Sequence, residues 1–430
     1  MKKYELLPTP DNINESLEKN SLNRNISLSQ MAKLLNGIDE NTIISIDGDW
    51  GVGKTFFIKQ FLYLNENENL SHKYSDIDQS EFEKYSDSHI NIYYNAWQND
   101  DHVEPIKSLI FNILNEFPKY ENEISNSKEL YDSAKPILIN ILDKLTHGII
   151  TKECFENLNS FADLAKEIYT VDETKKSLNK LLELITQKRR ITLIIDELDR
   201  CKPDYAIKML ETIKNFYIND KLTILVVTNN KQLSHTVKKF YGESFDGMSY
   251  LHKIYDNSIY LRVDNIKNYL SDYFQICQRT YLPEDVSFLL LTHFNFSLRE
   301  INKYITMYNI WKKQIEFEDI FDKERSSINN MFLIPFTLIL KIHDEDSFQK
   351  LISGNGEEII RKFIKFIENS SFDKDYVGWF KRSLFKVDEG NLLANVVIEK
   401  YKQYLKDRDN SIMNFNEVVS ILDRNANYEI

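Results

Sequence analysis

The sequence predicts an α/β protein in which helices flank a parallel sheet, followed by a region that is helical throughout. Four short segments rich in β-branched and apolar residues alternate with helical patterns, and they cover residues 42–46, 89–94, 191–195 and 222–227. Strands separated by helices form parallel sheets. The segment 191–195 contains only one polar residue, Thr192, which is typical of a strand buried on both faces. From about residue 266 onward, apolar residues recur at helical spacing.

The elements before the second strand are predicted in chain order. Residues 1–25 are polar and contain two prolines, so we expect an irregular N-terminal arm. Residues 27–38 show the apolar spacing of a helix. The strand 42–46 runs through a glycine turn into a helix with apolar residues at positions 57, 61 and 64, and the acidic stretch 65–88 is expected to be a loop.

The remaining elements define the expected domains. A charged segment of amphipathic helices, residues 105–187, separates the second and third strands. A helix over 205–217 and two short segments, 232–241 and 251–262, complete the sheet region. We therefore expect an arm (1–25), an α/β domain (26–265) with a helical insert at about 105–187, and a helical C-terminal domain (266–430).

Composition excludes several classes of protein. The chain has 430 residues, and its 54 basic and 66 acidic residues give a net charge of −12, which disfavours a protein that coats nucleic acid. The cysteines, Cys154, Cys201 and Cys277, have no metal-binding spacing and form no disulfide framework, so we expect a reducing, cytoplasmic setting.

No membrane segment is expected from the sequence. The first residues lack the apolar core of a signal peptide. The longest apolar run, residues 331–340, is far shorter than the roughly 20 residues that span a bilayer, and a buried helix is the better interpretation.

The glycines point to one loop. Average usage would give roughly 30 glycines in a chain of this length, yet the chain has only 11, and three of them fall between positions 48 and 53. The segment Gly48-Asp49-Trp50-Gly51-Val52-Gly53-Lys54-Thr55 matches the phosphate-loop pattern G-x-x-x-x-G-K-[ST]. It follows a predicted strand and precedes a predicted helix, which disfavours a chance match in a glycine turn.

This loop predicts a nucleotide-phosphate site. The glycines allow backbone N–H groups to point at the phosphates, and the following helix contributes its positive N-terminal dipole. Lys54 is expected to reach the β- and γ-phosphates, and the hydroxyl of Thr55 to bind Mg²⁺. The expected nucleotide contacts are Gly48, Asp49, Trp50, Gly51, Val52, Gly53, Lys54, Thr55 and Phe56.

A second motif, which is acidic, follows the predicted strand 191–195. Asp196 would emerge at the carboxyl edge of the sheet, beside the phosphate site, and hold Mg²⁺ through water. Glu197 would orient or deprotonate the attacking water. Asp199 is a further candidate for positioning metal or water. Arg200 would sense the γ-phosphate, or else form a structural ion pair with Asp196 or Asp199. The neighbouring Cys201 is expected to be a packed side chain.

Together these motifs resemble the KAP family of P-loop NTPases, which belongs with the AAA+ and STAND ATPases. The resemblance covers roughly residues 20–265 and weakly extends to about 305. It rests on four segments: the Trp-containing phosphate loop, Tyr94-Asn95-Ala96-Trp97, Ile195-Asp196-Glu197-Leu198-Asp199-Arg200-Cys201 and Tyr250-Leu251-His252-Lys253-Ile254-Tyr255-Asp256.

The resemblance implies binding of ATP with Mg²⁺, slow hydrolysis and a nucleotide-driven conformational switch. Bacterial relatives often look like parts of phage-defence systems. Many members carry transmembrane helices between the second strand and the third, but here that insert is charged throughout, so membrane association is not carried over.

Four further positions carry two interpretations each. Trp50, at the loop tip, would face nucleotide or a partner, whereas Trp97 is either a site residue or a core aromatic. Asn229, or Thr228 beside it, would sense the γ-phosphate after the strand 222–227, unless the asparagine only forms a turn. Arg299 resembles a second sensor arginine at a helix start, and is otherwise a surface residue beside Glu300.

Three functions remain open on the sequence alone. The first is an ATP hydrolase that acts as a switch, with self-association or a partner protein bound through the helical region. The second is an interaction scaffold in which nucleotide is structural or absent and the helical surface of residues 266–430 binds a partner. The third is a nucleic-acid motor, which the acidic charge disfavours. A basic run, Lys188-Arg189-Arg190, would be a local patch, although a solvated helix end explains it better.

Overall fold

The computed structural model contains two compact units, one spanning residues 7–264 and the other comprising residues 1–6 and 265–430. The structure describes residues 6–67, 73–101, 189–214, 220–263, 265–274, 283–294, 296–315, 332–369 and 392–406, with Pro105, Ser108, Leu109, Asn112 and Ile113. The predicted helical insert therefore lies almost wholly outside the described residues, and the two units are described separately.

The first unit is built on five parallel strands in the order β2-β3-β4-β1-β5. The strands are β1 (Thr42–Asp47), β2 (His89–Asn95), β3 (Arg190–Asp196), β4 (Leu222–Thr228) and β5 (Asn257–Tyr260). The predicted α/β class with a parallel sheet and a helical C-terminal region is confirmed. Because β4 lies between β1 and β3, the loops after all three strands meet at one edge of the sheet.

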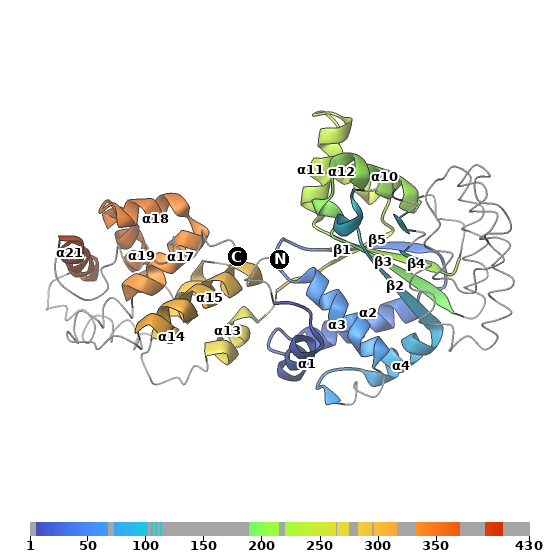
Figure 1. The fold of residues 1–430 in the computed structure, drawn as a ribbon, viewed down its shortest axis with the longest axis horizontal. Helices are drawn as coiled ribbons and strands as arrows, with labels where there is room; N and C mark the ends of the chain where they lie inside the picture. The colour runs from blue at the N-terminus through green and yellow to red at the C-terminus, as the bar shows by residue number, and fades with distance from the viewer. Residues whose placement is uncertain are drawn as a thin grey trace, which may run out of the picture. The chain divides into compact units, whose positions relative to one another are not determined.

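Helices cover both faces of the sheet (Figure 1). One group consists of α1 (Pro10–Lys19), α2 (Arg24–Asn36), α3 (Lys54–Glu66) and α4 (Gln79–Ser88), and the other of α10 (Pro203–Lys214), α11 (Asn230–Tyr241) and α12 (Gly247–His252). The first group shares a buried apolar core with β1, β3 and β4. Strand β4 is buried along its whole length, as expected for a central strand of a parallel sheet.

Two helices lie where the sequence predicted irregular chain. Helix α1 falls in the expected arm, where Thr9 caps the helix by accepting a bond from Asn12 N (3.3 Å) and Pro10 takes the first turn. Its two buried residues, Ile13 and Leu17, are four positions apart and pack into the core. This pair is too sparse to show a helical period within a polar sequence.

Helix α4 falls in the stretch expected to be a loop. Asp78 caps it by accepting a bond from Glu81 N (3.4 Å), and Phe82 and Tyr85 are its buried residues. Acidic composition concealed the helix because its other side chains face solvent or lie at the edge of the core.

The second unit consists of helices in the part that the structure describes. They are α13 (Ile266–Phe274), α14 (Pro283–His293), α15 (Leu298–Ile315), α17 (Ile334–His343), α18 (Glu345–Ile352), α19 (Glu357–Asn369) and α21 (Leu393–Lys406). Residues 334–340 are all buried, which confirms the expected buried helix. Among the described residues, no helix combines the length and apolar character needed to cross a bilayer.

Candidate functional site

The phosphate loop connects β1 to α3 and has the backbone that its glycines allow. Gly51 and Gly53 have φ values of +86° and +85°, in the left-handed region that favours glycine. A Cβ on Gly48 would lie 3.0 Å from the carbonyl oxygen of Leu261. Within the described residues, the backbone N–H groups of Gly53, Lys54 and Thr55 donate to no protein acceptor. The loop therefore presents free donors to an anion.

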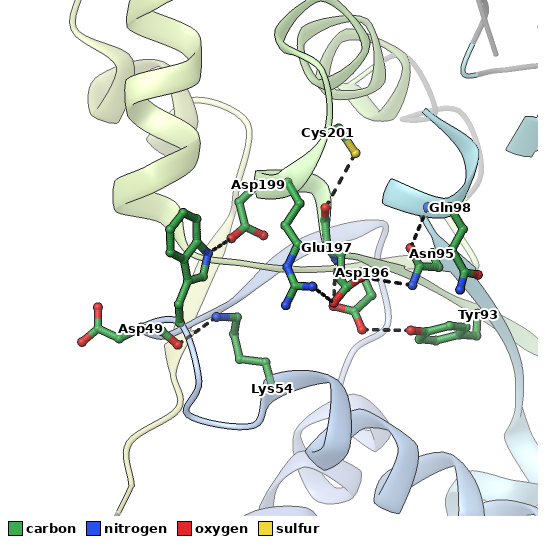
Figure 2. A network of polar contacts seen from close by, with 11 residues as sticks. Asp49, Lys54, Tyr93, Asn95, Gln98, Asp196, Glu197, Asp199 and Cys201 are labelled. Atoms are coloured by element: carbon green, nitrogen blue, oxygen red, sulfur yellow. Dashed lines mark hydrogen bonds and ion pairs between the residues drawn. The ribbon is translucent and has the colours of Figure 1, made fainter. Parts of the chain in front are cut away.

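Lys54 lies at the start of α3 and bonds to the loop itself. Its Nζ donates to the carbonyl oxygens of Gly48 (2.6 Å) and Asp49 (3.2 Å). Burial lowers the pKa of Lys54, and the charges of nearby carboxylates, including Asp199 and Asp196, oppose that shift. Lys54 and the carboxylates face one another across the site (Figure 2). A phosphate group would offer this ammonium group a charged acceptor in place of two carbonyls.

Asp196 ends β3 and is almost fully buried, with 1% of its surface exposed. Its Oδ2 accepts a bond from the hydroxyl of Tyr93 (2.9 Å), and its Oδ1 accepts one from Glu197 N (2.8 Å). Burial raises the pKa of Asp196 to about 6, and a hydrogen bond from the Thr55 side chain acts in the opposite direction. The structure thus brings Thr55 from the loop into contact with Asp196.

These oxygens fit Mg²⁺. The cation is bound by one or two carboxylates together with waters and substrate phosphates, so it needs no dense acidic cluster. The described residues contain no group of three or more His, Cys, Asp or Glu side chains that would hold a metal by themselves. Thr55 and Asp196 would supply the protein's share of a metal site completed by a nucleotide.

Glu197 follows at the edge of the sheet with both carboxylate oxygens engaged (Figure 2). Its Oε1 lies 2.9 Å from Nη1 of Arg200, and its Oε2 accepts a bond of 3.3 Å from Nδ2 of Asn95. Glu197 also has a left-handed backbone, with φ 63°. Arg200 pairs with Glu197 here, not with Asp196 or Asp199, and its guanidinium lies 5.3 Å from the ring centroid of Trp97.

The two tryptophans lie at the surface. Trp97 is 50% exposed, so the interpretation of a core aromatic is wrong. It begins a short 3-10 helix, Trp97–Asn99, which follows the end of β2. Trp50 is 47% exposed, and its Nε1 donates to Oδ2 of Asp199 at 2.5 Å. This bond joins the phosphate loop to the segment after β3.

The end of β4 places Thr228 and Asn229 near the same edge. Oδ1 of Asn229 accepts a bond from Gln232 N (3.0 Å), so the side chain caps α11. Thr228 is fully buried, and its hydroxyl has no partner in the described part of the chain. Thr228 pairs in register with Asp47, the last residue of β1. The Asn229 side chain is thus used as a cap, whereas the Thr228 hydroxyl is enclosed at the end of β4.

Several predicted residues take places away from the loop's phosphate donors. Phe56 is partly buried against the core of the first unit. Cys201 is buried, as expected, and burial raises the pKa of its thiol. Arg299 belongs to the second unit, in the first turn of α15, where Ser297 and Glu300 bond reciprocally as a capping box. A contact between Arg299 and nucleotide stays a prediction.

Three residues of the site were missed in the sequence. Tyr93 and Asn95 contact Asp196 and Glu197 from the neighbouring strand, and Arg24 donates to the carbonyl oxygens of Val52 and Gly53. Of these three, only Asn95 could have been predicted as a site residue from the sequence. It stands at the carboxyl end of a predicted strand, where the site residues of parallel sheets gather.

A phosphate loop after the first strand, an acidic residue at the end of a strand two places away and a Thr–Asp contact between them define a P-loop NTPase domain. Comparison with protein families agrees with this class. The model of the KAP family P-loop domain matches residues 24–315, more than half of the chain. The protein belongs to the KAP family, whose P-loop implies that it binds and hydrolyses nucleotide.

The chain is also similar to part of a curated protein. A RING finger protein of Plasmodium falciparum (isolate 3D7) is 22% identical over 305 residues, which cover 66% of this chain. The matched region spans only 22% of that relative's length, so the likeness concerns a fraction of the larger protein.

Proposed function

We propose that the protein hydrolyses ATP with Mg²⁺ and uses the hydrolysis cycle as a conformational or assembly switch. The observation that carries the proposal is that the phosphate loop meets the end of β3: its last three N–H groups have no protein acceptor among the described residues, Lys54 faces Asp196 (Figure 2), and the side chain of Thr55 lies beside Asp196. A hydroxyl and a carboxylate at this place would suit Mg²⁺ bound together with a nucleotide.

The chemistry follows from the side chains at this edge. Lys54 and the loop N–H groups would bind the phosphates, and Thr55 and Asp196 would hold Mg²⁺, which would supply positive charge to offset that of the phosphates. Glu197 accepts a proton from the attacking water. The water must then share the lone pairs of a carboxylate oxygen that already accepts a bond from Arg200 or Asn95.

Loop contacts supply a route from nucleotide to conformation. Lys54 bonds two loop carbonyls, while Trp50 and Asp49 in the same loop bond Asp199 and Tyr260. When a phosphate group accepts the hydrogen bonds of Lys54, the carbonyl oxygens of Gly48 and Asp49 lose their donor. The loop can then change its contacts with Asp199 and Tyr260. The switch begins at these exposed side chains.

The test compares turnover of ATP in the wild type, Lys54→Ala and Glu197→Gln. Glu197→Gln should keep nucleotide binding and lower kcat by roughly 10²- to 10⁴-fold, the usual contribution of a general base. Equal turnover in all three proteins would rule out hydrolysis at this site. Tight binding of Mg·ATP by a wild type with no turnover would instead favour a scaffold.

The cellular part of the proposal rests on the family alone. We propose that the helical region binds a partner protein or a second copy, and that the switch serves defence against phage. Sizing the protein with and without ATP tests assembly. Plating phage on bacteria that carry the wild type or Lys54→Ala tests defence, and equal plaque counts would exclude it.

A further inference from the structure

We propose that Arg24, at the start of α2, is a positioning residue that holds the phosphate loop in its nucleotide-binding conformation. The inference rests on the proposed nucleotide site and adds a part of the chain that lies before the first strand. Arg24 is buried, with 6% of its surface exposed. Its Nη1 donates to the carbonyl oxygen of Gly53 at 3.3 Å, and its Nη2 donates to that of Val52.

The bonds from Arg24 to the carbonyl oxygens of Val52 and Gly53 also fix the direction of the N–H groups that would bind the phosphates. In a planar trans peptide, the C=O of one residue and the N–H of the next point in opposite directions. Arg24 draws the oxygens of Val52 and Gly53 toward itself, so the N–H groups of Gly53 and Lys54 point the other way. Those two N–H groups have no protein acceptor within the described residues. The guanidinium fork thus aims two donors into the phosphate site.

The fork also suits this task chemically. Arginine presents several N–H donors in one rigid plane, so a single side chain can hold two successive carbonyls. The contact is close on the loop side as well, because a Cβ on Gly53 would lie 3.0 Å from Nη1 of Arg24. Gly53 therefore serves two purposes, its left-handed backbone and the room that it leaves for Arg24.

The turn between α1 and α2 holds Arg24 rigidly. Asn20 and Asn23 have left-handed backbones, with φ values of 45° and 54°, which asparagine tolerates better than most residues. Asn25 donates from Nδ2 to the carbonyl oxygens of Leu17 (2.9 Å) and Ser75 (2.8 Å). Its N–H donates to Oδ1 of Asn20 at 3.2 Å. The turn is thus tied to two neighbouring segments.

The N-terminal helices therefore act as a support for the nucleotide site. Helices α1, α2 and α3 lie together on one side of the sheet (Figure 1). Helix α3 continues directly from the loop, and Arg24 adds a side-chain link from α2 to the loop carbonyls.

The chain offers a matched control. Arg190, the first residue of β3, also donates from Nη1 and Nη2 to two successive carbonyl oxygens, those of Asp39 (2.9 Å) and Glu40 (2.8 Å). It lies at the amino edge of the sheet, opposite the end of β3 that carries Asp196. Substituting Arg190 removes the same kind of bond without touching the phosphate loop.

The experiment measures affinity for Mg·ADP by calorimetry, with thermal unfolding, in the full chain. Arg24→Lys keeps the charge but loses the fork, and we expect binding about tenfold weaker, as for the loss of one charge-assisted bond. Arg24→Gln should weaken it at least as much. Arg190→Lys and Arg190→Gln should stay within twofold of the wild type, although all four variants lower Tm.

The outcomes separate this inference from the proposed function. ADP affinity of Arg24→Lys equal to that of Arg190→Lys would overturn the positioning role and leave the nucleotide site standing. A wild type that binds neither Mg·ADP nor Mg·ATP would overturn the proposed function and this inference together. If Arg24→Gln does not fold, the difference in ADP affinity between Arg24→Lys and Arg190→Lys decides whether Arg24 positions the loop.

Discussion

Arg200 and Glu197 form an ion pair, with Nη1 of Arg200 2.9 Å from Oε1 of Glu197. The other oxygen of Glu197 accepts a bond from Asn95, so each oxygen of the candidate base already has one partner that competes with water. Because Arg200 contacts the base and not Asp196 or Asp199, its effect on turnover should pass through Glu197.

A double-mutant cycle tests this relationship. Arg200→Gln frees one carboxylate oxygen and should raise kcat about threefold when Glu197 is present, corresponding to about 0.7 kcal/mol in the barrier. In the Glu197→Gln background the same change should have no effect on kcat, because the coupled partner is gone. A similar fold-change in both backgrounds would show that Arg200 acts on the nucleotide directly.

The bond between Trp50 and Asp199 predicts a fluorescence signal for nucleotide binding. The indole is half-exposed and belongs to the loop whose carbonyls hold Lys54, so its surroundings should change when phosphate binds Lys54. We expect tryptophan emission to change on addition of Mg·ATP, and Trp50→Phe to remove most of that change.

Trp97→Phe is the matched control for Trp50→Phe. Trp97 is equally exposed but stacks near Arg200 after β2, outside the phosphate loop. This variant should keep the emission change. If Trp97→Phe removes the signal and Trp50→Phe keeps it, the loop does not rearrange as proposed.

Tyr93 should govern the need for Mg²⁺ through Asp196. Its hydroxyl donates to Oδ2 of Asp196, and Lys59 Nζ lies 3.1 Å from the centroid of its ring. Tyr93→Phe removes only the hydroxyl and keeps the ring for Lys59. Because residues that orient a metal ligand alter metal affinity by roughly 10- to 100-fold, the Mg²⁺ concentration for half-maximal turnover should rise about tenfold.

Tyr94→Phe is the control, since its hydroxyl bonds Ser108 (2.8 Å) and Tyr205 (2.5 Å), away from the site. It should lower stability by about 1 kcal/mol, as for a lost buried hydrogen bond, and leave the Mg²⁺ requirement unchanged. An equal shift in both variants would mean that Tyr93 acts only through general packing.

The sequence predicted the parts of the site that are local in the chain. The phosphate loop and Asp196 are readable because each needs only a strand, a turn and a few adjacent residues. Tyr93 lies 103 positions before Asp196, and Arg24 lies 28 positions before Val52. Such contacts depend on which strands and helices become neighbours, which a pattern within one segment does not show.

The elements of the fold that could be predicted were likewise those with a clear pattern within one segment. Strands β3 and β4 are buried along nearly their whole length, so their apolar runs were visible. Helices α1 and α4 bury only two residues each, and their capping residues, Thr9 and Asp78, are common in loops as well. Their stability comes from packing against the sheet domain, not from their own pattern.

Asp196 carries a stability cost that its proposed role in binding metal would explain. Burial raises its pKa from an ordinary value of 3.8 to about 6. The folded state therefore binds more protons than the unfolded state between these values, and stability falls as pH rises through this window. The shift corresponds to about 3 kcal/mol against folding above pH 6, at about 1.4 kcal/mol for each pH unit.

Asp196→Asn should therefore stabilise the nucleotide-free protein while abolishing Mg²⁺-dependent turnover. Asparagine is uncharged but accepts only one of the two bonds from Tyr93 and Glu197 N, so we expect a net gain of about 1 kcal/mol at pH 7.5. Urea unfolding in EDTA measures it, and the gain should shrink at pH 5. Asp199→Asn, the same change at a less buried neighbour, should alter stability by under about 0.5 kcal/mol. A loss of stability at pH 7.5 in Asp196→Asn would show that the hydrogen bonds to the carboxylate outweigh its burial.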